Sequence, residues 1–198
     1  MTSVKLTADT TVYAKWIAST AKNPFTDVPD GAYYHDAVIW AAEKDITDGK
    51  TSTTFAPAAD CTRAQVVTFL WRAMGSPKPA AASNPFADVK AGAYYYDAVL
   101  WAVEKGITKG TTATAFSPDR TVTRAQFVTF LWRMADSPAP KGTSSFADVT
   151  DTGAYYYSAV LWAAEQGITK GTTATTFSPG EACNRGQVVT FLYRYLGK

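Results

Sequence analysis

Residues 123–134 read TRAQFVTFLWRM, a segment whose apolar residues recur at the spacing of one helix face. Two close relatives of this segment occur in the chain, TRAQVVTFLWRA at 62–73 and NRGQVVTFLYRY at 184–195. We call the first four residues of each segment the TRAQ box. The box arginines are spaced 61 positions apart: Arg63, Arg124 and Arg185. A fixed period of this kind indicates three copies of one structural unit.

Each TRAQ box has the pattern of a capping box, which starts a helix. The first side chain accepts a hydrogen bond from the backbone of the third helical residue, and the glutamine there reaches back to the first backbone N–H. The pairs are Thr62 with Gln65, Thr123 with Gln126, and Asn184 with Gln187. Behind the central box lies an apolar stripe of Phe127, Phe130, Leu131 and Met134. We therefore expect a helix behind every box, with one face in a core.

Upstream of each box the chain predicts a shorter helix and a loop. The copies open with F-x-D-V at Phe25, Phe86 and Phe146. In the second copy we expect an aromatic-led helix from Tyr94 to Glu104, ended by Gly106 in the left-handed conformation. Asp88 is expected to bond backbone amides of the turn that follows it. A Thr- and Gly-rich loop with a Ser-Pro turn at 117–118 then leads to the box.

A helix pair of this size cannot bury both faces alone, so we expect three pairs to share one axis. The predicted fold is mainly α, with three helix-loop-helix repeats in a pseudo-threefold assembly. Pro-, Ser- and Ala-rich linkers separate the copies. They divide the chain into a strand-like N-terminal remnant with its linker at 1–22 and repeats at 23–79, 80–140 and 141–198.

Composition excludes several classes of protein. The 198 residues are 46% hydrophobic and only 18% charged, which excludes an intrinsically disordered chain. No apolar run approaches the roughly 18–20 residues of a membrane-spanning helix. A net charge of +2 does not support the dense phosphate neutralisation of general DNA binding.

Taken together, these features resemble three S-layer homology repeats, the wall-anchoring module of Gram-positive surface proteins. The likeness rests on F-x-D-V, on Gly-Ile-Thr-x-Gly at 106–110 and 167–171, on the F-x-P turn, and on the TRAQ box, which is similar to the family's T-R-A-E signature. It covers about residues 23–197 and implies a three-pronged spindle whose second helices form a central three-helix bundle. The alternation around Val4 and Leu6 resembles the closing strand of a Listeria–Bacteroides-type repeat, which implies a longer extracellular protein with its secretion signal upstream.

The resemblance implies a non-covalent cell-wall anchor without a cofactor. Grooves between adjacent prongs are expected to bind secondary cell-wall polysaccharide, typically carrying pyruvylated N-acetylmannosamine. Each box arginine would pair with the ligand's carboxylate, loop glycines would let the backbone approach the sugar, and tyrosines would stack on it. The expected ligand-binding residues are Arg63, Arg124, Arg185, Gln65, Gln126, Gln187, Lys109, Lys170, Gly106, Gly110, Gly167, Gly171, Tyr95 and Tyr156.

The box arginines have two interpretations from the residues alone. A cation at a helix N-terminus opposes the macrodipole, which favours anions there. All three copies nevertheless carry one, as expected if an anion is held jointly by the helix amides and the guanidinium group. Alternatively, each arginine pairs with a structural acid such as Asp88, an arrangement that is common and weak at protein surfaces.

The first repeat departs from the others in its Gly-Ile-Thr-x-Gly loop. Asp45 replaces the first glycine, and Asp48 stands where the other copies have Lys109 and Lys170. A charge reversal within several ångströms weakens the attraction for an anion, so the groove lined by this loop is expected to bind an anionic sugar worst. The third box carries Gly186, whose consequence the sequence leaves open.

The aromatic residues divide into two groups. Tyrosines are consecutive at 33–34, 94–96 and 155–157, so at least one in each copy is expected to be exposed and to offer a sugar platform. The tryptophans are expected in core or inter-prong packing: Trp40, Trp71, Trp101, Trp132 and Trp162.

Two cysteines, Cys61 and Cys183, occupy equivalent positions in the first and third copies, where the second copy has Val122. They either form a disulfide that closes a very long loop or are two small buried apolar residues.

An enzymatic function has little support in the sequence. His35 is the only histidine and is expected to be solvated, and the cysteines lack zinc-site spacing. Asp27, Asp88 and Asp148 are three like carboxylates in three copies, whereas a glycosidase needs two unlike carboxylates at one bond. The alternative to an anchor is a protein-interaction module of a surface protein that uses its Tyr-rich grooves.

Overall fold

The computed structural model describes residues 22–80 and 83–197. Six helices form this part of the chain: α1 (His35–Glu43), α2 (Arg63–Ala73), α3 (Tyr96–Glu104), α4 (Arg124–Met134), α5 (Tyr157–Glu165) and α6 (Arg185–Leu196). Within the described ranges, β pairing is confined to three isolated bridges. The prediction of a mainly helical fold with three helix-loop-helix repeats is confirmed. The predicted N-terminal strand falls on residues 1–21, outside the described part.

The second helix of each repeat starts at a complete capping box, as the sequence predicts. In α4 the Thr123 side chain accepts from the Gln126 backbone N–H, and the Gln126 Oε1 accepts from the Thr123 N–H at 3.1 Å. The same reciprocal pair opens α2 at Thr62 and α6 at Asn184. These bonds fix where the box arginine enters the helix.

The first helix of each repeat is shorter and has no side-chain cap. In the second repeat it begins at Tyr96, two residues later than expected, and ends before Gly106 at φ +68°. That backbone is left-handed, so glycine is the favoured residue there. Asp45 adopts the same conformation at φ +55° in the first repeat. The expected left-handed helix end is therefore confirmed, and it holds even where glycine is replaced.

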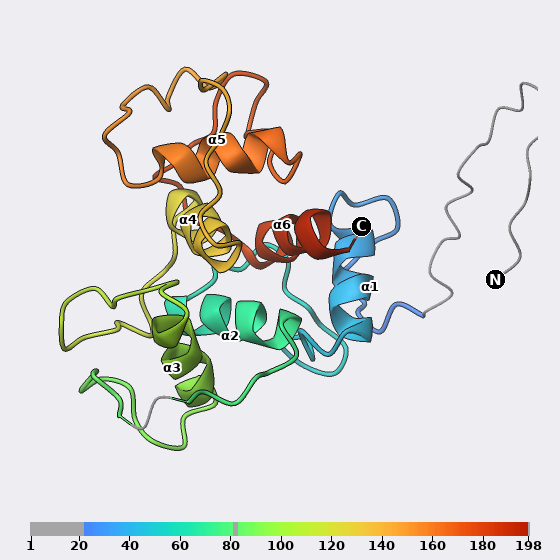
Figure 1. Ribbon diagram of the computed structural model, residues 1–198. Helices are drawn as coiled ribbons and strands as arrows, with labels where there is room; N and C mark the ends of the chain where they lie inside the picture. Colours follow the sequence, from blue (N-terminus) through green and yellow to red (C-terminus); the bar gives the residue numbers. More distant parts are fainter. Residues whose placement is uncertain (1–21, 81–82, 198) are drawn as a thin grey trace, which may run out of the picture.

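The helices pair between repeats rather than within them. α2 packs against α3, α4 against α5, and α6 against α1 (Figure 1). Each of the three prongs thus combines the second helix of one repeat with the first helix of the next. The last prong joins the two ends of the folded chain, and the C-terminus of α6 lies beside α1 (Figure 1). The pseudo-threefold ring is closed by this contact.

A ring of three backbone hydrogen bonds marks the axis where the repeats meet. The Cys61 N–H donates to the Cys183 carbonyl at 3.0 Å, and the Cys183 N–H donates to the Val122 carbonyl at 2.8 Å. The Val122 N–H completes the ring by donating to the Cys61 carbonyl at 2.9 Å. α2, α4 and α6 start directly after these residues, so their N-terminal ends converge at the axis.

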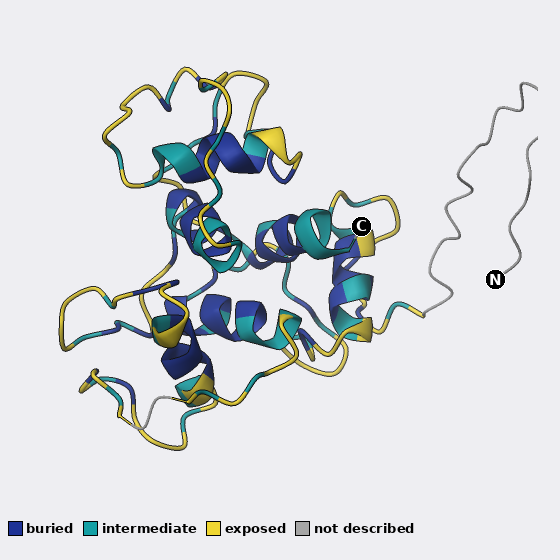
Figure 2. Cartoon of the chain, in the orientation of Figure 1, coloured by how far each residue is buried: buried dark blue, intermediate teal, exposed yellow. Residues whose placement is uncertain are grey.

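Burial follows this arrangement, with the inner faces of the helices buried and the connecting loops exposed (Figure 2). Phe55, Phe116 and Phe177 of the F-x-P turns are fully buried, each beside the phenylalanine that opens its own repeat. The tryptophans pack in or against this core, as expected. None of the helices in the described ranges is long and apolar enough to cross a membrane.

Candidate functional site

The box arginines are buried side chains that reach from one repeat into the next. Their residues are only 2–4% exposed. The Arg63 Nε–H donates to the Phe116 carbonyl at 2.8 Å, Arg124 to that of Phe177 at 2.8 Å, and Arg185 to that of Phe55 at 2.7 Å. Each guanidinium also lies over the ring of the same phenylalanine, 4.6–4.7 Å from its centroid. A cation–π contact and a carbonyl together fix the direction of each arginine.

The aspartate of F-x-D-V fixes the F-x-P turn, whose phenylalanine carbonyl accepts the hydrogen bond from the box arginine. Asp88 accepts from the Phe116 N–H at 2.8 Å and from the Ser117 N–H at 2.7 Å. Asp27 and Asp148 make the same pair of bonds in their own repeats. We expected these carboxylates to bond the turn directly after them. They bond the F-x-P turn some 28 residues later instead, because the intervening helix and loop bring that turn back.

Both detailed expectations for the box arginines need correction. No ion pair among the described residues includes a box arginine, so the pairing with Asp88 is not formed. The helix amides are also not free for an anion. The Arg63 N–H donates to the Arg120 carbonyl at 2.9 Å and the Ala64 N–H to that of Pro118 at 3.0 Å. Because α4 and α6 make the corresponding bonds, the guanidinium alone remains to meet a ligand.

Two of the three guanidinium groups keep an unpartnered N–H. The Nη2 atoms of Arg124 and Arg185 are buried and make no hydrogen bond, whereas the Arg63 Nη2 donates to the Thr108 hydroxyl at 3.3 Å. Buried polar groups in native proteins are almost always paired, so each of these N–H groups requires an acceptor from a bound water or a ligand. Burial lowers the pKa of all three arginines, that of Arg63 to about 10. With that pKa, Arg63 remains a cation at neutral pH.

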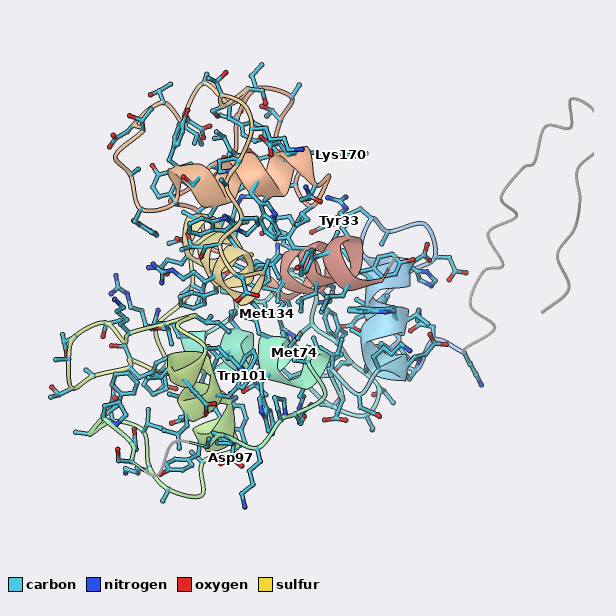
Figure 3. All side chains as sticks on the ribbon, in the orientation of Figure 1. Tyr33, Met74, Asp97, Trp101, Met134 and Lys170 are labelled. Carbon is cyan, nitrogen blue, oxygen red and sulfur yellow. The ribbon has the colours of Figure 1, made fainter. Side chains whose placement is uncertain are left out.

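The two arginines that carry an unpartnered N–H each line a groove. The α6 groove, about 360 Å³ in volume, is lined by Tyr33, Arg124, Lys170, Gln187, Phe191 and Arg194. The α2 groove, about 310 Å³, is lined by Asp48, Lys50, Gln65, Arg72, Tyr94 and Arg185. Three repeats contribute to each. In the α6 groove, for example, Arg124 comes from the second repeat, Lys170 from the third and Tyr33 from the first. Figure 3 labels Tyr33 between α5 and α6, and Lys170 beside the end of α5.

The two grooves differ most at their cations. Asp48 forms an ion pair with Arg72 in the α2 groove, with 2.9 Å between its Oδ2 and the arginine Nη1. In the α6 groove, Lys170 stands at the position of Asp48, and the Arg194 Nη1 donates to the Ile168 carbonyl at 3.0 Å. The linings of both grooves therefore include three cations. The α6 groove has no lining acid, whereas in the α2 groove Asp48 already pairs with Arg72 and leaves Lys50 and Arg185.

Comparison with known proteins agrees with this architecture. The family model of the S-layer homology domain matches residues 24–67, 85–128 and 145–189. The chain belongs to the S-layer homology (SLH) domain family. This is a non-catalytic anchoring module of cell-surface proteins, which places the chain at the cell surface.

The SLH region recurs in larger proteins of different kinds. The chain is 30% identical over 173 residues to the surface-layer 125 kDa protein of Lysinibacillus sphaericus, covering 85% of this chain and 14% of that protein. It is 32% identical over 114 residues to the S-layer protein sap of Bacillus anthracis, covering 57% and 14%. It is also 25% identical over 198 residues to an amylopullulanase of Thermoanaerobacterium thermosulfurigenes, covering 98% and 10%. The chain thus spans about a tenth to a seventh of the length of these relatives.

Several residues expected in the SLH grooves are found there. Gln65 and Gln187 line the α2 and α6 grooves, and Lys170 and Gly171 line the α6 groove. The box glutamine and box arginine of one repeat face different grooves, since Gln65 lies in the α2 groove while Arg63 reaches toward α4 and lies over Phe130 at 5.3 Å. Gln126, Lys109 and Gly110 occupy the corresponding positions around α4.

The loop glycines fall into two pairs that are required for different structural reasons. At Gly110 and Gly171 a Cβ atom would lie about 2.5–2.7 Å from the ring of Phe86 or Phe146, so packing within the repeat requires glycine there. Gly106 and Gly167 line neither groove and have open space where a side chain would be. Their left-handed backbone accounts for glycine at these positions, and the expected close approach to sugar stays a prediction.

The tyrosines that line the two grooves are not the two that the resemblance implied, whose role in binding stays a prediction. Tyr95 and Tyr156 line neither groove, and the residue before each is the more exposed one. Tyr33 and Tyr94 line the grooves and, with Tyr155, are 57–63% exposed. Which tyrosine of each run is exposed depends on where the helix begins. The helix begins later than expected, so the sequence alone offered no basis for choosing the exposed one.

The sequence carries a signal for one further set of groove residues. An arginine follows each box arginine at the same spacing: Arg72, Arg133 and Arg194. In all three repeats its Nη1 reaches the carbonyl of the loop isoleucine, at 3.0–3.5 Å. An arginine repeated at one position behind every capping box indicates a shared role, just as the repeated box does.

The structure also shows the surroundings of Gly186 and of the two cysteines. A Cβ at Gly186 would lie 3.1 Å from Cδ1 of Tyr34, so glycine gives that ring room. Cys61 and Cys183 are free, fully buried thiols in the structure. Among the described residues, no cluster of His, Cys, Asp or Glu side chains is suited to hold a metal ion.

Proposed function

We propose that this SLH module holds its parent protein to the cell wall by binding an anionic polysaccharide, with the carboxylate of a pyruvylated sugar at Arg124 in the α6 groove. The observation that carries the proposal is the unpartnered, buried Nη2 of Arg124 in a groove with two further cations. A carboxylate supplies the acceptor that this N–H lacks, and charge-assisted bonds of this kind are the stronger ones.

The remaining parts of the groove suit a sugar ring. Tyr33 is 60% exposed at the groove edge, and its ring offers an apolar face beside a polar tip. Lys170 and Gln187 add donors for carboxylate and hydroxyl oxygens. Because the Arg124 Nε–H is already bonded to the Phe177 carbonyl, the guanidinium is positioned before a ligand arrives.

A second candidate is a protein-interaction module that grips a partner through the exposed tyrosines. The exposure of Tyr33, Tyr94 and Tyr155 favours this alternative. It differs from the first proposal in predicting contacts that depend on tyrosine and that acidic sugar does not compete.

The test is sedimentation of the purified chain with Gram-positive cell walls, before and after hydrofluoric acid removes the secondary polymer. We expect binding to native walls, loss of binding to stripped walls, and competition by free pyruvylated N-acetylmannosamine. Arg63→Ala, Arg124→Ala and Arg185→Ala are run in parallel, with thermal denaturation as the control for folding. Equal binding to stripped walls, or none to either preparation, would overturn the proposal and leave the protein-interaction function.

A further inference from the structure

The axis of the molecule brings two buried thiols together from opposite ends of the chain. Cys61 precedes α2 and Cys183 precedes α6, and both are 0% exposed. They belong to the backbone ring described above, whose third member is Val122. The grooves do not use these residues, so their pairing is a separate feature of the fold.

The backbone register places the two cysteines next to one another in this ring. Asp60 and Asn184 form an antiparallel bridge, and in that register the next residues inward are Cys61 and Cys183. The direct hydrogen bond from the Cys61 N–H to the Cys183 carbonyl, at 3.0 Å, agrees with this pairing. Directly opposed residues of antiparallel strands have Cα atoms about 4.5–5.5 Å apart. Disulfides span Cα separations of about 4.4–6.8 Å.

We propose that Cys61 and Cys183 form an intramolecular disulfide that covalently joins the first and third repeats at the axis. The two thiols lose two protons and two electrons to form one S–S bond. A disulfide oxidant, such as oxidised glutathione or an oxidoreductase, accepts them and is reduced to two thiols. The second repeat has valine at this position and takes no part, so one bond forms and no odd thiol remains.

The bond reinforces the contacts that join the first and third repeats. These repeats are far apart in sequence, and they meet through the packing of α1 against α6 and through backbone hydrogen bonds at the axis. A link between residues 61 and 183 keeps those repeats together when the prong of α1 and α6 opens. An anchor under mechanical load would gain from this.

Burial determines when the bond forms. Burial raises the pKa of the Cys61 thiol to about 12 and that of Cys183 further, so neither supplies thiolate for exchange once the core has closed. Oxidation therefore takes place while the repeats assemble, and the finished bond is protected from reductants.

The experiment compares the denatured chain refolded with reduced glutathione and with a mixture of reduced and oxidised glutathione. Each sample is then labelled with N-ethylmaleimide in denaturant and weighed intact. We expect two labels after reducing refolding and none after oxidative refolding. The oxidised chain should be a monomer two hydrogens lighter, with one tryptic cross-link between the peptides that contain Cys61 and Cys183. Its Tm should be higher by about 10 °C, because the bond closes a loop of about 120 residues.

The double variant Cys61→Val/Cys183→Val is the matched control, because it copies the second repeat at both positions. It should fold with a Tm near that of the reduced chain and show no response to oxidant. The proposal is overturned if the wild-type chain still carries two labels after oxidative refolding, or if its cysteines link separate molecules. Both readouts use the wild-type chain, so they do not depend on the variant.

Discussion

The α2 and α6 grooves are built from equivalent residues on equivalent helices, yet they differ in the charge available to a ligand. Both contain a buried box arginine with an unpartnered Nη2 and an exposed tyrosine. In the α6 groove Lys170 and Arg194 face no lining acid, whereas in the α2 groove Asp48 pairs with Arg72 at 2.9 Å.

The comparison shows how a repeat protein can specialise one site without altering its frame. The helix caps, the aspartate that holds the F-x-P turn and the carbonyl that orients the arginine are the same in both grooves. Two loop positions change the electrostatics, because Asp48 and Lys50 stand in the α2 groove where the α6 groove has Lys170 and Thr172, and all four are exposed. Affinity for an anion can therefore vary between grooves while the fold is constant.

The largest effect is expected for the box arginines. Arg124→Ala should lower affinity for the pyruvylated polysaccharide about tenfold to a hundredfold, because a hydrogen bond to a charged group is worth about 1.5–3 kcal/mol. Arg185→Ala in the α2 groove should lower it about threefold or less. Both variants lose the same bond to a phenylalanine carbonyl, so their structural cost is matched. Titration calorimetry measures the affinities, and equal losses would contradict the difference between the grooves.

The next variant gives the α6 groove the acid of the α2 groove. Lys170→Asp should lower affinity about tenfold, since it removes one cation and places a carboxylate near Arg194. Lys170 is exposed, so the Tm should stay within about 2 °C. Lys78→Asp, in the exposed linker, makes the same charge change away from either groove and should bind nearly as the wild type does. If both variants lose affinity equally, net charge rather than the groove is responsible.

The local parts of this architecture were predictable because their signals are local. The capping boxes, the helices behind them and the left-handed end at Gly106 each depend on residues within one turn. The grouping of Lys170 with a box arginine came from the family resemblance, and both line the α6 groove.

The long-range parts were not predictable, and for physical reasons. An apolar stripe specifies that a helix is buried but not which helix covers it, so the pairing of α2 with α3 across repeats could not be derived. The partner of each box arginine is a backbone carbonyl, which every residue has, so Phe116 gave no signal as the acceptor for Arg63. The helix amides looked free for an anion because their partners, such as Pro118, come from another repeat.

The reverse change should improve the weaker groove. Asp48→Lys removes the ion pair with Arg72 and restores the lysine of the other repeats, so the α2 groove gains cationic charge. We expect its affinity to rise about fivefold and calorimetry to detect a second binding site for each chain. Asp48 is exposed, and surface ion pairs contribute about 0–1 kcal/mol, so stability should change little. Asp48→Asn separates the two causes, since it breaks the pair without adding a cation. If Asp48→Lys still binds ligand at only one site, charge does not limit binding in the α2 groove.

The smallest effect is expected at the tyrosines, where it tests whether the sugar ring lies in the same groove as the carboxylate. Tyr33→Ala removes a ring that is 60% exposed at the α6 groove and should weaken binding about threefold to tenfold, the range of one aromatic contact of about 0.5–1.5 kcal/mol. Tyr94→Ala makes the same change at the α2 groove and should have no measurable effect in the wild-type background, but should weaken binding once Asp48→Lys is present. Tyr33→Phe keeps the ring and should bind as the wild type does. If Tyr33→Phe loses as much affinity as Tyr33→Ala, the hydroxyl rather than the ring contacts the ligand. Equal losses for Tyr33→Ala and Tyr94→Ala in the wild type would mean that both grooves are occupied despite Asp48.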